Sequence, residues 1–154
     1  MKVATWLLLS FITLCSTPSY SGVEQYSQCY KEAAARYGIS SALLKAIGEV
    51  ESNHNPSAEN EHSKARGILQ VHSWWWPLLE SQHGISADDL WDACININVG
   101  AWILRQEIDR YGRTWTAVGA YYAGPYMAGK IAEYEDHYLI YTKKVHKALQ
   151  NYMR

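Results

Sequence analysis

Two glutamates near the end of one predicted helix face different directions. The sequence predicts a helix that Ser40 or Ser41 caps and that runs to about Ser52. Its apolar side chains recur at helical spacing, at Leu43, Leu44, Ile47 and Val50. At about 100° per residue, Glu51 falls inside this apolar stripe, whereas Glu49 falls on the opposite side of the helix. We therefore expect Glu51 to point toward the core or a cleft beside it, and Glu49 to point toward solvent.

The apolar surroundings expected for Glu51 would change its chemistry. A carboxylic acid in such surroundings ionises reluctantly, so its pKa rises and it can hold a proton near neutral pH. General acid catalysis on a glycosidic bond requires an acid of this kind in a cleft. The alternative is a structural acid at a helix end, bound to an arginine or to backbone donors. The helical period alone leaves both roles open.

Glu51 also opens the first of three short motifs. The string ESNHNP begins at Glu51, GILQ occupies residues 67–70, and AYYAG occupies residues 120–124. In this order and at this spacing, the motifs resemble those of the lytic transglycosylase domain of the soluble, lysozyme-like type. The resemblance covers residues 29–141 and implies a mainly α fold, a single lysozyme-like helical domain.

A fourth segment narrows the resemblance to one branch of that family. Together with the small size of the chain, the string CININVGAW at residues 94–102 resembles the specialised enzymes that open the cell wall for secretion machines. Those enzymes accompany type III and type IV secretion systems, conjugation machinery and type IV pili. The resemblance therefore implies peptidoglycan glycan strands as the substrate and components of such a machine as further partners.

The resemblance also implies a role for each matching residue. Glu51 matches the catalytic acid and base, and Ser52 matches the positioning residue beside it. Gln70 matches the glutamine that lines the glycan cleft, and Gly67 would let backbone and sugar approach closely. Tyr121 matches the tyrosine near the catalytic carboxylate.

One position departs from the family pattern. Tyr122 stands where the family often has an asparagine that holds the N-acetyl group of the substrate. We expect the Tyr122 ring to stack on a sugar or to pack against the protein.

The reaction that the resemblance implies needs one carboxylic acid and no cofactor or metal. Between Glu51 and Gln70 the only other acids are Glu59 and Glu61, in a polar segment. A lytic transglycosylase cuts between N-acetylmuramic acid and N-acetylglucosamine and leaves a 1,6-anhydromuramic end. Two alternatives remain: a lysozyme-type hydrolase in which Glu59 or Glu61 steers a water, and a glycan-binding assembly module without catalysis.

The elements that must position these motifs are predicted to be helical almost throughout. Beside the helix of Glu51, helical patterns cover residues 25–37, 67–79, 92–110, 115–123 and one or two stretches of 128–154. Pro77 would disturb the second of these, and at least one of Trp74, Trp75 and Trp76 would pack in the core. Residues 53–65 are polar and form a predicted loop, in which His54 is expected to be solvated.

The first residues carry an export pattern. Lys2 precedes an apolar run over residues 3–15, and small polar residues follow, which is typical of a secretory signal peptide. The run is shorter than the roughly 20 apolar residues that span a membrane. We expect residues 1–21 to be removed and residues 22–154 to form the catalytic domain of a periplasmic or otherwise exported protein without stable membrane insertion.

Cys29 and Cys94 remain after removal of the predicted leader, which contains the third cysteine. An even pair in an oxidising compartment favours a disulfide, and two buried free thiols are the alternative. The histidines lack the spacing of metal ligands. Fourteen basic against fifteen acidic residues give a net charge of -1, so no general attraction for nucleic acid is expected.

Overall fold

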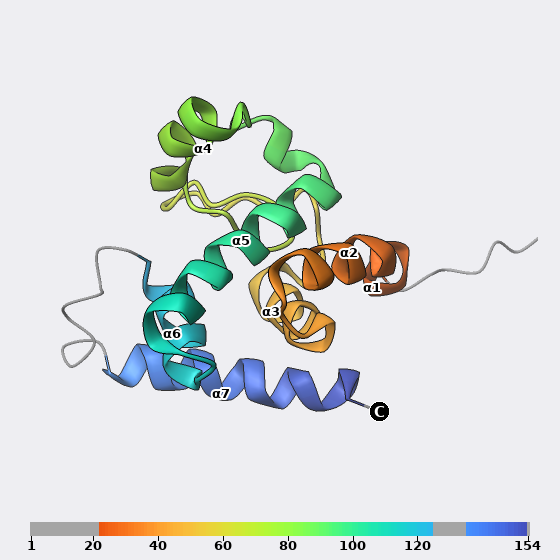
Figure 1. The fold of residues 1–154 in the computed structure, drawn as a ribbon, viewed down its shortest axis with the longest axis vertical. Coiled ribbons are helices and arrows are strands. Elements are labelled where there is room, and N and C mark those ends of the chain that lie inside the picture. Colours follow the sequence, from red (N-terminus) through yellow and green to blue (C-terminus); the bar gives the residue numbers. More distant parts are fainter. Residues whose placement is uncertain (1–21, 125–134, 154) are drawn as a thin grey trace, which may run out of the picture.

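Helices form the long elements of the chain (Figure 1). The computed structural model describes residues 22–124 and 135–153. In chain order the elements are α1 (Gly22–Gln25), α2 (Ser27–Tyr37), α3 (Ser41–Ser52), η1 (Ser73–Trp75), α4 (Trp76–His83), η2 (Asp89–Trp91), α5 (Ala93–Tyr111), α6 (Trp115–Ala123) and α7 (Glu135–Tyr152). Within the described residues, extended pairing is limited to isolated bridges of Arg66 with Glu59 and Val71. The expected mainly α, single helical domain is confirmed.

The longest helix, α5, contributes to two hydrophobic clusters. Figure 1 shows it crossing the middle of the molecule, with α4 on one side and α2, α3, α6 and α7 on the other. The larger cluster joins these last four helices to α5 through buried side chains that include Leu44, Ile47, Leu104, Val118 and Val145. The smaller cluster consists of Val71, Leu79, Leu90, Val99 and Ile103. The segment between α3 and α5 is therefore a second layer that rests on α5.

The predicted ends of α3 are confirmed. The Ser40 hydroxyl accepts a hydrogen bond from the backbone N–H of Leu43 at 3.4 Å, which satisfies one of the free donors of the first turn. The helix ends at Ser52, because Asn53 adopts a left-handed conformation with φ 53°. Helix α3 packs along α7, so its last turn faces the C-terminal helix (Figure 1).

The predicted helix over residues 67–79 is wrong in its first half. Residues 67–71 form a turn that Arg66 closes by pairing with Val71, with backbone hydrogen bonds of 3.1 and 2.9 Å. The α-helix begins only at Trp76. Pro77 does not disturb this helix but starts it, because the first turn has no use for the N–H that proline lacks.

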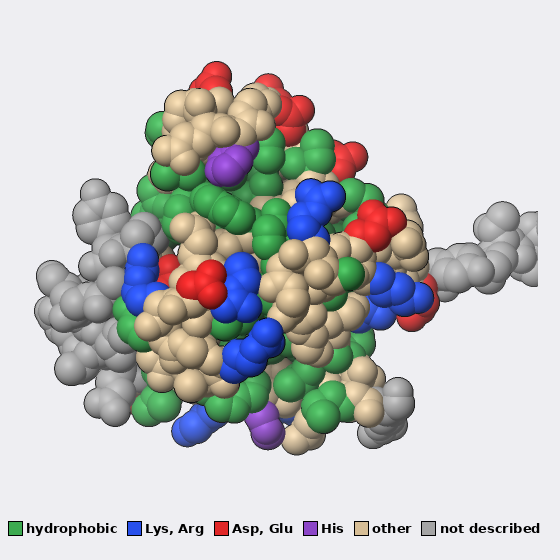
Figure 2. All heavy atoms as spheres, viewed as in Figure 1, with side chains coloured by type: hydrophobic (Ala, Val, Ile, Leu, Met, Phe, Trp, Pro, Cys, Tyr) green, Lys and Arg blue, Asp and Glu red, His purple; other side chains and the backbone are tan. Residues whose placement is uncertain are grey.

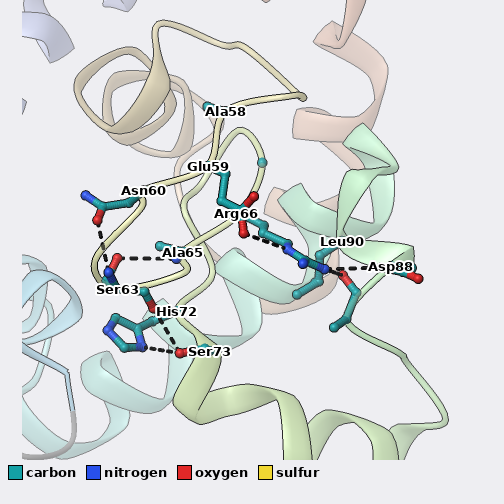
Figure 3. Close-up of polar contacts among 12 residues, drawn as sticks. Ala58, Glu59, Asn60, Ser63, Ala65, Arg66, His72, Ser73, Asp88 and Leu90 are labelled. Atoms are coloured by element: carbon teal, nitrogen blue, oxygen red, sulfur yellow. Dashed lines mark hydrogen bonds and ion pairs between the residues drawn. The ribbon is translucent and has the colours of Figure 1, made fainter.

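An arginine connects this turn to the rest of the second layer (Figure 3). The guanidinium of Arg66 lies between the rings of Trp76 and Trp91, 4.5 and 4.8 Å from their centroids. It also pairs with Glu59 at 3.5 Å and with Asp88 at 3.2 Å. The Arg66 side chain thus connects the loop to α4 and to η2.

The buried side-chain amide of Asn96, in α5, also holds the turn at residues 67–71. Asn96 of α5 donates to the carbonyls of Arg66 and Leu90, at 2.8 and 3.0 Å, and accepts from the N–H of Leu69 at 2.8 Å. Gly67 has φ 74°, and a Cβ there would lie 2.2 Å from Asn96 Nδ2. The fold itself therefore requires glycine at position 67.

The predicted disulfide is present. Cys29 of α2 is bonded to Cys94 in the first turn of α5, with a Cα–Cα distance of 5.1 Å. The predicted signal peptide and residues 128–134 of the last predicted helical stretch lie outside the described residues. No helix in the described ranges is long and apolar enough to cross a membrane. Figure 2 shows basic and acidic side chains on the same face rather than a broad basic surface.

Candidate active site

Glu51 lies in the last turn of α3 and faces inward, as the helical period predicts. Removal of its carboxyl group from water raises the pKa of Glu51 from 4.5 to about 7, and a hydrogen bond from Tyr141 lowers it by less. The Tyr141 hydroxyl donates to Oε1 of Glu51 at 2.7 Å. A group with this pKa is divided between its acid and base forms at neutral pH, which is the state that proton transfer in both directions needs.

Glu49 does not point freely into solvent, contrary to expectation. It is half-buried, and the Tyr152 hydroxyl of α7 donates to its Oε2 at 2.7 Å. The helical period gave the direction of Glu49 correctly. It could not show that the end of α7 covers that side of α3.

Tyr141 belongs to the site although none of the sequence motifs contains it. It is buried, and burial together with the Glu51 charge raises the pKa of its hydroxyl well above its usual value, so it remains a donor. Tyr141, Val145 and Ala148 form the buried stripe of α7. A tyrosine on such a stripe must find a partner for its hydroxyl, which is the signal that could have identified it.

Ser52 and Tyr121 hold neighbouring carbonyls of the turn at residues 67–71. The Ser52 hydroxyl donates to the carbonyl of Ile68 at 2.9 Å, and the Tyr121 hydroxyl donates to that of Leu69 at 2.5 Å. The Glu51 charge is among the causes that raise the pKa of Tyr121, after burial, so this ring lies near the acid. These two motif residues join α3 and α6 to the same turn.

Gln70 uses its amide donors inside the loop. Its Nε2 donates to the carbonyls of Gly67 and Ala58, at 2.9 and 3.1 Å, and its backbone is left-handed with φ 46°. Among residues 22–124 and 135–153, none donates to its Oε1. Gln70 therefore has an acceptor, not a donor, left for a ligand. Its contact with a glycan and that of Gly67 stay predictions.

Tyr122 lies at the surface beside the acid. It is 47% exposed and stacks on Tyr141 with ring centroids 4.7 Å apart and an interplanar angle of 21°. Through Tyr141 this exposed ring is connected to Glu51. A half-exposed aromatic face near an acid with a raised pKa is suited to stack on a pyranose ring.

Trp74 lies near the same end of α6. It stacks on His72 with centroids 3.5 Å apart, and it fills the space where a Cβ of Gly124 would be. Trp75 and Trp76 instead pack against the smaller hydrophobic cluster. As expected, at least one of the three tryptophans serves the core.

The two acids of the loop after α3, Glu59 and Glu61, do not form a pair with Glu51. Glu59 is bound to Arg66, as Figure 3 shows, and Glu61 is exposed in the loop. Neither contributes to the pKa shift of Glu51. The structure thus brings together Glu51, Ser52, Tyr121, Tyr122 and Tyr141, with Gly67 and Gln70 in the adjoining turn. No group of three metal-ligating side chains occurs in the described part of the chain.

Comparisons with known proteins find a matching family and several relatives of this chain. Residues 28–143 match the family model described as the transglycosylase SLT domain. The chain is similar to protein IpgF of Shigella flexneri, with 36% identity over 94% of this chain and 96% of the relative. It is also similar to invasion protein IagB of Salmonella typhimurium (strain SL1344), with 38% identity over 64% of each chain. A peptidoglycan-binding-like protein of Escherichia coli O157:H7 is 34% identical over 76% of this chain and 78% of the relative.

Proposed function

Because the chain belongs to the transglycosylase SLT domain family, we propose that it is a peptidoglycan lytic transglycosylase with Glu51 as its only catalytic acid and base. The observation that carries this proposal is the enclosed carboxyl group of Glu51, which has a pKa of about 7 and accepts a hydrogen bond from the neutral phenol of Tyr141. An acid that must first give and then take one proton needs this balance between its two forms.

In the first step, protonated Glu51 donates its proton to the oxygen that joins N-acetylmuramic acid to N-acetylglucosamine. The bond from that oxygen to C1 of the muramic residue breaks, and the N-acetylglucosamine end leaves as an alcohol. The positive charge that develops at C1 lies near the carboxylate that Glu51 has become. Tyr141 donates to that carboxylate and so stabilises it.

In the second step, the ionised Glu51 removes the proton from the 6-hydroxyl of the same muramic residue. The 6-oxygen bonds to C1, which closes the 1,6-anhydro ring and returns the proton to Glu51. No water is consumed, and no cofactor takes part. Tyr122 stacks on a sugar ring near Glu51, where the family's asparagine would hold the N-acetyl group.

Hydrolysis on the same fold is less well supported. A hydrolase of the lysozyme type uses a second carboxylate to steer water or to stabilise the sugar cation. Glu59, the nearest candidate in sequence, is engaged by Arg66. A module that only binds glycans would have no use for an enclosed acid with a raised pKa.

The proposal extends to location and biological role. The export pattern of residues 1–21 and the Cys29–Cys94 disulfide support a periplasmic or otherwise exported enzyme. The similarity to invasion protein IagB supports a role in local opening of the wall for a secretion, conjugation or pilus apparatus. Its partners would be glycan strands and components of that apparatus.

Digestion of purified sacculi tests the proposed activity. Mass spectrometry of the released muropeptides should show anhydromuramic ends, each one water lighter than a reducing end. Reducing muramic ends would support the hydrolase instead. Binding of sacculi without release of fragments would support the assembly module.

A further inference from the structure

Three polar side chains from three helices meet His54, which lies just after the end of α3. The Tyr30 hydroxyl of α2 lies 2.8 Å from Nδ1 of His54, and Nε2 of His54 lies 2.9 Å from the Tyr152 hydroxyl of α7. Tyr152 in turn donates to Glu49 of α3 at 2.7 Å. Contrary to expectation, His54 is not a solvated loop residue, because its exposed fraction is 6%. We call Tyr30, His54, Tyr152 and Glu49 the His54 network.

The donor and the acceptor of each hydrogen bond in the His54 network can be assigned by starting from Glu49, the residue at the end of the network. A carboxylate only accepts, so Tyr152 uses its single proton on Glu49. The Tyr152 oxygen must then accept from Nε2–H of His54. With its proton on Nε2, the neutral imidazole accepts from Tyr30 through Nδ1. Each of these polar groups has a defined partner only while His54 is neutral.

The backbone at the same place is held in an uncommon conformation. Asn53 and His54 are consecutive non-glycine residues with φ values of 53° and 59°. Their N–H groups close the end of α3 on the carbonyls of Glu49 and Gly48, at 3.0 and 3.1 Å. Left-handed non-glycine residues persist where surrounding contacts fix them. The two side-chain hydrogen bonds of His54 provide such contacts.

We propose that His54 is a positioning residue for Glu51. Glu51 lies between the two points at which the His54 network holds α3, Glu49 on one side and His54 on the other. By fixing the last turn of α3 against α2 and α7, the network keeps the Glu51 carboxyl enclosed and within reach of Tyr141. This proposal deepens the proposed function, since it rests on Glu51 as the acid.

The titratable groups around His54 and Glu51 indicate how loss of the His54 network should change the pKa of Glu51. The titratable groups near His54 and Tyr30 are Tyr26 just before α2, Lys45 and Glu49 of α3, and Tyr152 of α7. Burial lowers the pKa of His54, Glu49 opposes this and Lys45 adds to it, so the net effect favours the neutral ring. Glu51 itself is faced by Tyr121 of α6 and Tyr141 of α7. Loss of the His54 network should therefore give water access to the carboxyl group of Glu51, and this hydration lowers the pKa of Glu51.

The variant His54→Gly removes the side-chain hydrogen bonds and keeps a residue that accepts the left-handed backbone. The carboxyl carbon of Glu51 can be followed by ¹³C NMR in protein labelled at glutamate. We expect its pKa to fall from about 7 toward 4.5 in the variant. We also expect kcat on sacculi to fall, by up to about 10²-fold, with a smaller change in KM, since a slightly misplaced group costs rate more than binding.

A second variant and a control keep the test decisive. Tyr152→Phe keeps the ring and breaks the link between His54 and Glu49, so it should shift the Glu51 titration in the same direction. Tyr37→Phe removes a hydrogen bond of 2.9 Å between α2 and α5, at Asn98, and should leave the titration of Glu51 unchanged. An unchanged titration in both folded network variants would overturn the proposal, whatever their melting temperatures. The titration needs no substrate, so it also decides the matter if the wild-type protein releases no anhydro products and the proposed function fails.

Discussion

Two inward-facing glutamates, Glu51 at the end of α3 and Glu107 on α5, have different surroundings. Glu107 is 3% exposed and pairs with Arg110, which lies one turn further along α5, at 3.2 Å. Burial raises the pKa of Glu107, and the Arg110 charge opposes this rise. Among residues 22–124 and 135–153, no cation pairs with Glu51, and its side chain receives a hydrogen bond from Tyr141. A fold that needs a buried charge supplies a counter-charge, whereas a site that must move a proton leaves it out.

The largest expected effect is a difference in activity between a variant of Glu51 and a variant of Glu107. Glu51→Gln keeps the shape of the side chain but cannot carry a proton, so release of muropeptides should fall by about 10²–10⁴-fold or more. Glu107→Gln should leave the rate nearly unchanged. Both rates can be followed by the clearing of sacculus suspensions. Full activity of Glu51→Gln would remove Glu51 from the site.

The raised pKa of Glu51 should also be visible in the pH dependence of stability. Because the folded protein raises the pKa of Glu51 to about 7, the folded state holds this proton more tightly than the unfolded chain. The contribution of Glu51 to stability is therefore fully present below about pH 4.5 and is lost as pH rises to about 7. The loss is on the order of 3 kcal/mol. Denaturant unfolding from pH 4 to 8 should show a flatter dependence for Glu51→Gln than for the wild type, and equal slopes would contradict the raised pKa.

The ion pair of Glu107 should matter for stability alone. Arg110→Met leaves a buried carboxylate without its partner. We expect a loss of about 1–2 kcal/mol, less than for a fully buried pair, because Arg110 is half exposed to solvent. Chemical unfolding measures this loss, with sacculus clearing as the control. A large fall in activity at unchanged stability would mean that Glu107 also serves the site.

Tyr122 should give the smallest change in stability. Its ring is 47% exposed, so Tyr122→Ala should lose about 0.5–1.5 kcal/mol with the stack on Tyr141, rather than the 3–5 kcal/mol of a core aromatic. If the ring stacks on a sugar, KM for glycan strands should rise. A loss of stability of core size with unchanged KM would assign Tyr122 to packing.

The direction of Glu51 could be predicted because it depends on the helical period of α3 alone. The limits of α3 and α6 were equally local, since serine caps one and glycine ends the other. Tyr141 could not be placed, because it lies 90 residues from Glu51 and meets it only when α7 packs along α3. The burial of His54 could not be predicted for the same reason, because its hydrogen-bond partners belong to α2 and α7.

The turn at residues 67–71 shows a second kind of limit. Its apolar residues fit a helical period, and Ile68 and Leu69 are indeed buried. The turn is not helical because Asn96, Ser52 and Tyr121 bind its peptide groups from three different elements. Long-range hydrogen bonds leave no periodic pattern in the sequence. The burial of residues 67–71 could therefore be predicted, whereas their conformation could not.

One measurement tests the central claim, that Glu51 alone transfers the proton and that no water enters the product. Sacculi should be digested in water enriched in ¹⁸O and the fragments analysed at once by mass spectrometry. We predict anhydromuramic ends without ¹⁸O, because the 6-hydroxyl of the substrate attacks C1. Reducing muramic ends that carry ¹⁸O would show that water attacks and would contradict the account.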